Sequence, residues 1–194
     1  MKPAVKQQIV ISGVGGQGVL FVTRLIAEAA IDKGLPVLTS ETHGMAQRGG
    51  TVVSHLKVGD FASPLIRPRK ANGLLALKAE VPDAHLLFLE PDAWAVVNSD
   101  SPRDFRNMAK LFNTDCDQLA LEIGNARSAN LVLLGFGVAA TIGGDHVKQP
   151  MFCSIEDIRN VLLKRFSGNK KVLDAAVAAI EAGYDSFGSK RSSK

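Results

Sequence analysis

Residues 8–20 read QIVISGVGGQGVL: an apolar β-branched run, a turn with four glycines and the start of a helix. The run at 8–12 predicts a strand, and the apolar periodicity of residues 19–33 predicts a helix that Gly34 ends. A second strand follows at residues 37–40. A strand, a glycine-rich turn and a helix leading into another strand form a β-α-β unit. We therefore predict an α/β chain with a Rossmann-like start.

The remainder of the chain predicts more strands and then mostly helices. Strands are expected at residues 51–58, 72–77 and 93–97, some helix within 81–90, and helices at 115–123, 129–142, 158–166 and 170–181. Ser154 and Asp157 predict a capping box, and Gly183 is expected to end the last helix. Since no repeat or linker divides the chain, we predict a single Rossmann-like domain with a helical C-terminal part over residues 1–186. Residues 187–194 are expected to be a basic disordered tail.

Composition excludes several classes of protein. The 194 residues suffice for one core, and the two cysteines, Cys116 and Cys153, cannot form a disulfide framework or a cysteine-ligated cluster. The first residues lack the pattern of a signal peptide, and the apolar runs are too short for a membrane span, so we expect a cytoplasmic protein and no membrane partner. The net charge of +4 comes partly from the tail, and aromatic residues are sparse, which argues against nucleic acid as a partner.

The glycine turn has two interpretations. Gly13, Gly15, Gly16 and Gly18 allow a tight turn, and the following helix exposes N–H groups that attract a phosphate. Glu41 stands about twenty residues further on, where a dinucleotide-binding fold places the acid that holds a ribose hydroxyl. A stand-alone NAD- or FAD-binding protein is therefore one hypothesis. The alternative is that the glycines only permit close packing while the turn faces a partner protein.

Residues 41–50 read ETHGMAQRGG. Acidic, basic, histidine and amide side chains together are unusual in a loop that only connects two strands. Ligands bind at the carboxyl ends of strands in open α/β sheets, so this loop and the glycine turn are expected to line one shared site. The candidate catalytic residues are His43, which can titrate near neutral pH, and Arg48, which can hold an anion. The alternative is that both only hydrogen-bond the loop to its neighbours or lie at a subunit interface.

Three motif blocks also carry a family resemblance. GVGGQGVL at residues 13–20, SETHGMAQRGGTVVSHLKVG at 40–59 and GNARSANLVLLG at 124–135 resemble, in order and spacing, the gamma-type subunit or domain of the 2-oxoacid:ferredoxin oxidoreductases. The length and the HGMAQRGG loop resemble most the small beta subunit of the indolepyruvate-specific enzymes. The domain predicted at 1–186 would then be the pyruvate/ketoisovalerate-type gamma domain.

The resemblance implies a subunit of an enzyme that decarboxylates a 2-oxoacid, transfers the acyl group to coenzyme A and passes electrons to ferredoxin. In that family a large partner subunit or other domains carry thiamine diphosphate and iron–sulfur clusters, so no cofactor is expected on this chain alone. The sequence agrees, since it has no thiamine diphosphate motif and no cysteine set for a cluster. The residues expected to bind a cofactor or to line the junction with the partner are Gly13, Gly15, Gly16, Gln17, Gly18, Glu41, Gln47, Gly49 and Gly50.

Some residues depart from the family pattern or carry no predicted chemistry. Lys78 stands where an acid is usual, and residues 175–179 lack a usual asparagine, which leaves open the substrate and a third hypothesis, a scaffold that has lost its activity. No metal site is predicted. His55 is expected on a polar strand face or at an interface, and His85 and His146 in solvent, whereas the two cysteines are expected to be buried or half-buried thiols.

Overall fold

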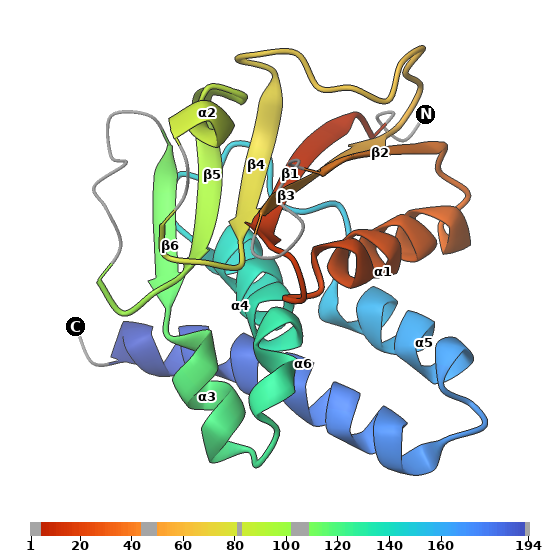
Figure 1. Ribbon diagram of the computed structural model, residues 1–194, viewed down its shortest axis with the longest axis vertical. Coiled ribbons are helices and arrows are strands. Elements are labelled where there is room, and N and C mark those ends of the chain that lie inside the picture. Colours follow the sequence, from red (N-terminus) through yellow and green to blue (C-terminus); the bar gives the residue numbers. More distant parts are fainter. Residues whose placement is uncertain (1–4, 44–49, 81–82, 102–108, 193–194) are drawn as a thin grey trace.

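The computed structural model describes residues 5–43, 50–80, 83–101 and 109–192. These form a six-stranded sheet with the order β2-β3-β1-β4-β5-β6 (Figure 1). The strands are β1 (Gln7–Val14), β2 (Val37–His43), β3 (Thr51–Val58), β4 (Ala71–Ala76), β5 (Leu89–Asn98) and β6 (Lys110–Thr114). The predicted α/β class is confirmed. β1, β4, β5 and β6 run parallel, whereas β3 is antiparallel to both β1 and β2.

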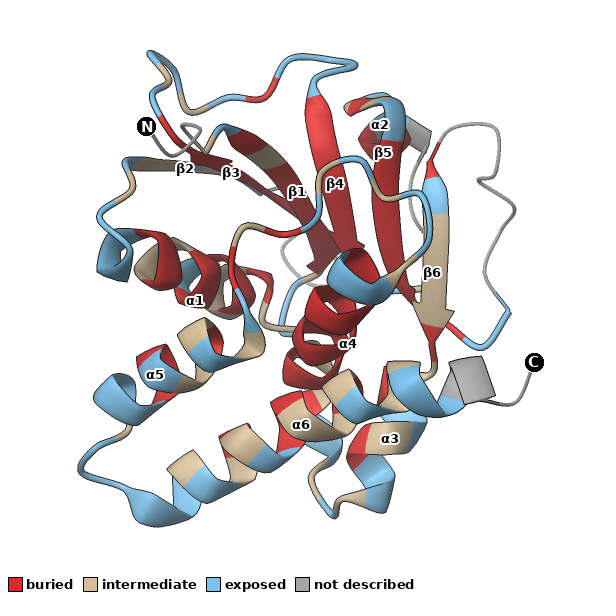
Figure 2. Cartoon of the chain, turned by 180° about the vertical axis from the view of Figure 1, so that it is seen from behind, coloured by how far each residue is buried: buried red, intermediate tan, exposed pale blue. Residues whose placement is uncertain are grey.

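Most helices lie on one face of the sheet. They are α1 (Val19–Asp32), α3 (Cys116–Glu122), the 3-10 turn η1 (Ala126–Ser128), α4 (Ala129–Gly143), α5 (Ile155–Arg165) and α6 (Lys170–Ser192). The other face is covered by the short helix α2 (Asp83–Leu86) and by the segment 59–70. Figure 2 shows the buried residues along the central strands and the inner sides of α1 and α4. Among the described residues, the long helices therefore cover one face of the sheet, and the other face has only the short helix α2 and an irregular segment over it.

Alternating side chains explain both layers. Ile9 and Ile11 of β1 point into the core beneath the helices, whereas Val10 joins the smaller apolar cluster on the opposite face. A strand buried on both faces reads as a continuous apolar run, which is why residues 8–12 predict a strand so clearly. The capping box of α5 is confirmed, because the Ser154 and Asp157 side chains each bond the backbone N–H of the other residue.

The first three strands depart from a simple β-α-β unit. β2 has the same direction as β1, as expected for a crossover through α1, but β3 lies between them and pairs with both. The sequence predicts a strand at 51–58 but does not predict where in the sheet it lies. Its insertion separates β2 from β1 by two strand spacings, roughly 10 Å. Glu41, which lies in β2, is therefore not on the strand adjacent to β1.

The helical part differs from the sequence prediction at its end. Gly183 does not end α6, which continues to Ser192. A Cβ at Gly183 would overlap the carbonyl oxygen of Val132 in α4, so this glycine permits close helix contact instead of stopping the helix. The prediction of a disordered tail from residue 187 is wrong as far as Ser192. The edge strand β6 was not predicted, because its residues are only partly buried and lack clear alternation.

The apolar helix α4 forms the centre of the helical layer. By length and composition the window Ala126–Gly143 is apolar enough to cross a membrane, but 67% of it is buried inside the protein, as in a core helix. Eleven of its residues from Leu131 to Thr141 are buried. Ile142, near the end of this apolar helix, is 51% exposed. Gly135 faces the Ile180 carbonyl of α6, which brings these two helices into close contact.

Candidate functional site

The carboxyl ends of the parallel strands meet at one edge of the sheet. β1, β4, β5 and β6 end there at Val14, Ala76, Asn98 and Thr114. The glycine turn follows β1 at this edge, and its Gly16 and Gly18 have φ values of 93° and 82°, which only glycine adopts readily. The turn is therefore built for backbone exposure at the place where α/β sheets bind ligands.

The two predicted loops meet at this edge. The N–H of Gly15 donates to the carbonyl of Gly50 over 3.2 Å. Gly50 directly precedes β3, which starts opposite the last residue of β1. Gln47, Arg48 and Gly49, and the side chain of His43, lie outside the described residues. The glycine turn and the end of the polar loop therefore lie at the same sheet edge, where Gly15 and Gly50 are in contact. The roles of His43 and Arg48 stay predictions.

Gln17 fixes the turn to the neighbouring strand. Its Oε1 accepts from the N–H of Val14 at 2.9 Å, and its Nε2 donates to the carbonyl of Leu77 at 3.1 Å. The backbone N–H of Leu77 also donates to the carbonyl of Ser12. Both the N–H and the carbonyl of Leu77, the residue directly after β4, are therefore hydrogen-bonded. A single glutamine amide thus connects the glycine turn to the end of β4. Its side chain has a structural task in addition to any contact with a ligand.

Asn98 continues this network to α3. Its Nδ2 donates to Leu77 (3.3 Å) and to Asp117 (2.9 Å), and its Oδ1 accepts from the N–H of Cys116 (2.8 Å). The amide therefore joins the ends of β4 and β5 to the first turn of α3. Neither Asn98 nor Asp117 is among the residues that the sequence motifs predict for the site. The signal available was a polar residue directly after the buried run 93–97, at the carboxyl end of a strand.

The third motif block lies beside the glycine turn. The side-chain amide of Asn130, in the first turn of α4, occupies the space next to Gly18 so closely that a Cβ at Gly18 would overlap it. The first turns of α1 and α4 are thereby neighbours. Ser128 directly precedes α4 but forms no capping bond, and its hydroxyl donates to the carbonyl of Asn125.

A pocket of about 330 Å³ opens between these elements. Its lining combines the glycine turn, the ends of β4 and β5, α3 and the start of α4, and the residues are Gly16, Gln17, Leu77, Asn98, Asp117, Ala126, Arg127, Ala129 and Asn130. Three amides, one guanidinium and one carboxylate give it many hydrogen-bonding groups and few apolar ones. Such a lining suits a polar ligand or the polar surface of a partner. No group of histidine, cysteine and acidic side chains suited to a metal occurs among the described residues.

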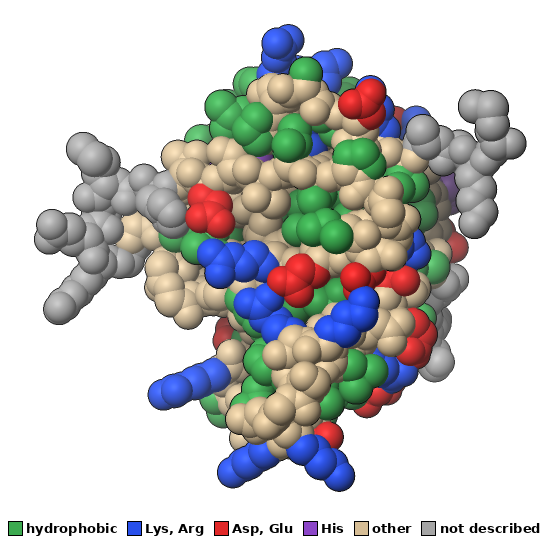
Figure 3. All heavy atoms as spheres, turned by 90° about the vertical axis from the view of Figure 1, so that its right-hand side faces the viewer, with side chains coloured by type: hydrophobic (Ala, Val, Ile, Leu, Met, Phe, Trp, Pro, Cys, Tyr) green, Lys and Arg blue, Asp and Glu red, His purple; other side chains and the backbone are tan. Residues whose placement is uncertain are grey.

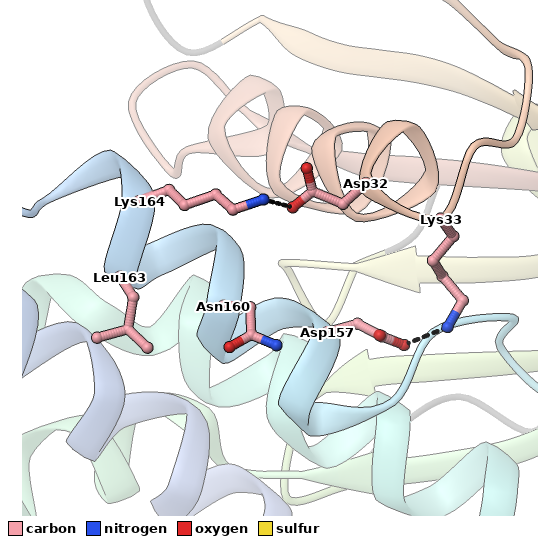
Figure 4. A pocket seen from close by; sticks show the side chains of 6 residues that line it. All are labelled: Asp32, Lys33, Asp157, Asn160, Leu163 and Lys164. Carbon is pink, nitrogen blue, oxygen red and sulfur yellow. Dashed lines mark hydrogen bonds and ion pairs between the residues drawn. The ribbon is translucent and has the colours of Figure 1, made fainter.

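A second pocket of about 360 Å³ lies between the end of α1 and α5 (Figure 4). Its charged groups are satisfied within the chain, since Lys33 pairs with Asp157 at 2.9 Å and Lys164 with Asp32 at 2.8 Å. Partial burial would raise the pKa of Asp157, but bonds from Lys33 and Ser154 outweigh it and lower the pKa. These pairs hold α5 onto α1. We therefore place the candidate site at the glycine turn, although its pocket is slightly smaller.

The geometry of Glu41 differs from that of a dinucleotide-binding acid. Glu41 lies within β2 opposite Ser54, which itself lies opposite Ile11 of β1. The acid is thus two strands from β1 and level with the middle of that strand, whereas a ribose-binding acid follows the strand adjacent to β1. This placement counts against the NAD or FAD hypothesis.

Two histidines are buried on the thinly covered face, contrary to expectation for His85. Nδ1 of His85 lies 2.7 Å from the hydroxyl of Ser12, and His55 accepts from the N–H of Ile66. Burial lowers the pKa of both rings, and the nearby charge of Lys57 lowers that of His55 further. Ser12 and His85 are 3% and 7% exposed and line no described pocket, so they connect β1 to α2. His146 is exposed and both cysteines are buried, as predicted.

Comparison with known proteins agrees with the motif resemblance. The family model described as "Pyruvate ferredoxin/flavodoxin oxidoreductase" matches residues 8–186. The chain is 31% identical over 200 residues to the indolepyruvate oxidoreductase subunit IorB of Archaeoglobus fulgidus, covering 91% of this chain and 93% of that protein. It is 29% identical over 195 residues to the ketoisovalerate oxidoreductase subunit VorA of Methanothermobacter marburgensis, covering 92% of this chain but only 36% of that longer protein.

Two solved structures have the same fold. The gamma subunit of a keto/oxoacid ferredoxin oxidoreductase from Geobacter sulfurreducens superposes with a TM-score of 0.72 at 24% identity, covering 94% of this chain and 99% of that one. A 2-oxoglutarate:ferredoxin oxidoreductase from Magnetococcus marinus superposes with a TM-score of 0.73 at 20% identity, covering 95% of this chain and 31% of that one. At these identities the likeness concerns the fold.

Proposed function

Because this chain belongs to the pyruvate ferredoxin/flavodoxin oxidoreductase family, we propose that it is the small subunit of an indolepyruvate-type 2-oxoacid:ferredoxin oxidoreductase. Membership makes it a subunit of a 2-oxoacid:ferredoxin oxidoreductase, whose activity resides in the complex. The choice of indolepyruvate is supported by the similarity to the Archaeoglobus subunit over most of both chains. Its place of action would be the cytoplasm.

The proposed reaction requires cofactors that the residues of this chain are not suited to bind. Oxidative decarboxylation of a 2-oxoacid anion with coenzyme A yields an acyl-CoA, CO₂, a proton and two electrons, and two ferredoxins accept one electron each. Two buried cysteines, one on α3 and one before α5, cannot ligate an iron–sulfur cluster, which takes four thiolates. Thiamine diphosphate and the clusters therefore belong to the large partner subunit in this proposal.

The carboxyl edge of the sheet is the part of this chain that we assign to the shared active site. Gly13, Gly15, Gly16, Gln17 and Gly18, with Glu41 and Gly50, would line the junction with the thiamine-bearing subunit. The observation that carries this assignment is that the first and third motif blocks line one polar pocket, while the second block is joined to the glycine turn by the Gly15–Gly50 hydrogen bond. Its amides and Arg127 supply donors for a polar substrate such as coenzyme A. His43, Arg48, Gln47 and Gly49 belong to the same loop and are proposed as its remaining members.

Reconstitution with the large subunit tests this proposal. Indolepyruvate, coenzyme A and ferredoxin should give acyl-CoA and reduced ferredoxin only when both chains are present. Unchanged turnover without this chain, or turnover by this chain alone, would refute the subunit role. A complex that turned over pyruvate or 2-oxoisovalerate but not indolepyruvate would refute only the substrate. A complete complex without any oxoacid turnover would support the scaffold hypothesis instead.

The alternative of a stand-alone dinucleotide-binding protein rests on the glycine turn after β1. Calorimetric titration of the isolated chain with NAD, NADP and FAD distinguishes the two. Heat of binding at low micromolar concentration, lost in a Gly18→Ala variant, would support the alternative. We expect no heat, because Glu41 is two strands away from β1 and Asn130 fills the space beside Gly18.

A further inference from the structure

A cluster of positive charge lies at the end of the sheet opposite the glycine turn. It surrounds the segment 59–70, which joins the end of β3 to the start of β4 and crosses the top of the molecule in Figure 1. We call it the basic patch, and its residues are Lys6, Lys57, Arg67, Arg69 and Lys70. Figure 3 shows Lys and Arg side chains projecting from this end of the molecule, with hydrophobic side chains beside them.

The patch residues are close together and lack acidic partners. The ammonium groups of Lys6 and Lys57 lie 5.1 and 5.0 Å from the ring centroid of the same residue, Phe61. None of the five cations forms an ion pair with another described residue. Asp60, within the segment, forms no ion pair with a described residue either, and Glu90 accepts a bond from the amide of Asn72. The five cations are therefore not paired with acidic side chains among the described residues.

This crowding has an electrostatic consequence at Lys57. Its side chain lies beneath the segment and the residue is only 7% exposed. Burial lowers the pKa of Lys57, and the neighbouring charge of Arg67 lowers it further. An acidic group placed over the patch would reverse this repulsion. The free chain thus holds charge that a complementary surface would stabilise.

The backbone holds the patch in one conformation. Arg69 has a φ of 59°, in the left-handed region that disfavours side chains with a Cβ. The N–H of Arg69 donates to Leu87 at 2.8 Å, and that of Lys70 donates to Phe88 at 2.8 Å, which fixes this strained turn. Glycine would be unstrained here. An arginine held in this position is consistent with a use for its guanidinium outside the chain.

Apolar side chains adjoin the charges. Leu65, next to Ile66 in the segment, is 52% exposed, and Leu87, whose carbonyl accepts from Arg69, is 60% exposed. Large apolar side chains beside arginine are typical of protein interfaces, whereas binding of nucleic acid relies on a charged stripe with aromatic stacking. The ring of Phe61, in the segment, is contacted by the ammonium groups of both Lys6 and Lys57. The patch therefore suits a protein surface.

We propose that the basic patch docks onto an acidic face of the large partner subunit. This inference rests on the proposed function and adds a contact at the opposite end of the strands from the glycine turn. A lasting partner fits better than a transient electron carrier, because in two similar proteins the region that matches this chain is about a third of a longer polypeptide and is thus permanently joined to further parts of the same chain. An acidic face would pair the free guanidinium groups and cover the two leucines.

Salt-dependent binding measurements on the two purified subunits test the proposal. The double variant Arg67→Glu/Arg69→Glu should bind the large subunit at least about tenfold more weakly than wild type in low salt, and added salt should weaken wild type more than the variant. Lys170→Glu/Lys171→Glu, at the exposed start of α6, changes the net charge equally and should bind like wild type. Arg69→Gly removes one cation while relieving its backbone, so it should fold at least as stably and still lose affinity.

The outcomes separate this inference from the proposed function. Absence of binding by wild type would refute the proposed function itself. Equal binding by wild type and both patch variants would overturn the docking proposal alone. Intact assembly with a raised KM for ferredoxin in the patch variants would overturn it in favour of the electron carrier. Loss of binding to a mixed-sequence DNA duplex with assembly unchanged would overturn it in favour of nucleic acid.

Discussion

Replacement of Gly183 by alanine places a methyl group where α6 crosses α4. The new Cβ would approach the carbonyl oxygen of Val132 more closely than the 3.0 Å that real Cβ atoms essentially never breach, and would lie 2.7 Å from the Val132 carbonyl carbon and 2.9 Å from the Phe136 nitrogen. All three obstacles are backbone atoms of α4, so no side chain can rotate away. One helix must shift relative to the other.

The expected loss of stability combines two opposing effects. Alanine is favoured over glycine inside a helix by about 1 kcal/mol. Overpacking against fixed atoms costs roughly 1–3 kcal/mol, and a rigid backbone obstacle places this contact at the upper end. The net loss is about 2 kcal/mol, and for a chain of this length it should lower Tm by about 4–8 °C. A shifted α4 also displaces Asn130, so binding to the large subunit should weaken.

Thermal melts followed by circular dichroism measure the effect. Gly188→Ala is the matched control, since it is the same substitution in the same helix, at an exposed glycine whose Cβ would meet nothing within 4 Å. It should leave Tm unchanged or raise it, by up to about 1 kcal/mol of added stability. A Gly183→Ala protein that melts at or above the wild-type temperature would show that α4 and α6 do not pack as closely as described.

Three other outcomes are expected. In chemical denaturation, Gly16→Ala should lose about 1–2 kcal/mol through its left-handed backbone alone, and Gly18→Ala should lose more because its Cβ also meets the neighbouring asparagine amide; equal losses would contradict that contact. Stability should fall as the pH drops below 6.5, because burial lowers the folded-state pKa of His55 and His85 and the unfolded chain therefore binds more protons. The variant His85→Gln should show a smaller fall in Tm between pH 8 and pH 5.5. The same fall in the variant as in wild type would argue against this role of His85. Burial raises the pKa of the Cys153 thiol to about 12, so a disulfide reagent at pH 8 should modify it only in denaturant, and rapid labelling of the native protein would disprove its burial.

Much of the site could be predicted from the sequence. A glycine turn after a buried strand and a polar loop after the next strand in the chain lie at the same sheet edge in any open α/β fold, and the Gly15–Gly50 bond agrees with that expectation. Asn98 could be recognised from the sequence only as a polar residue at the end of a strand, and Asp117 carries no such signal. They reach the pocket because β5 lies beside β4 and α3 follows β6, and the sequence does not state which strands are neighbours.

Local patterns determined what each segment is: the apolar run of β1, the periodicity of α1, the capping box at Ser154, and the motifs that carry the family resemblance. The tertiary structure decided what each residue does. It made Gly183 a helix contact instead of a helix end, placed β3 between Glu41 and the glycine turn, and buried His85. The reason is physical: propensity, capping and turn chemistry act over a few residues, whereas strand order and helix packing depend on contacts between residues far apart in the chain, which local sequence does not encode.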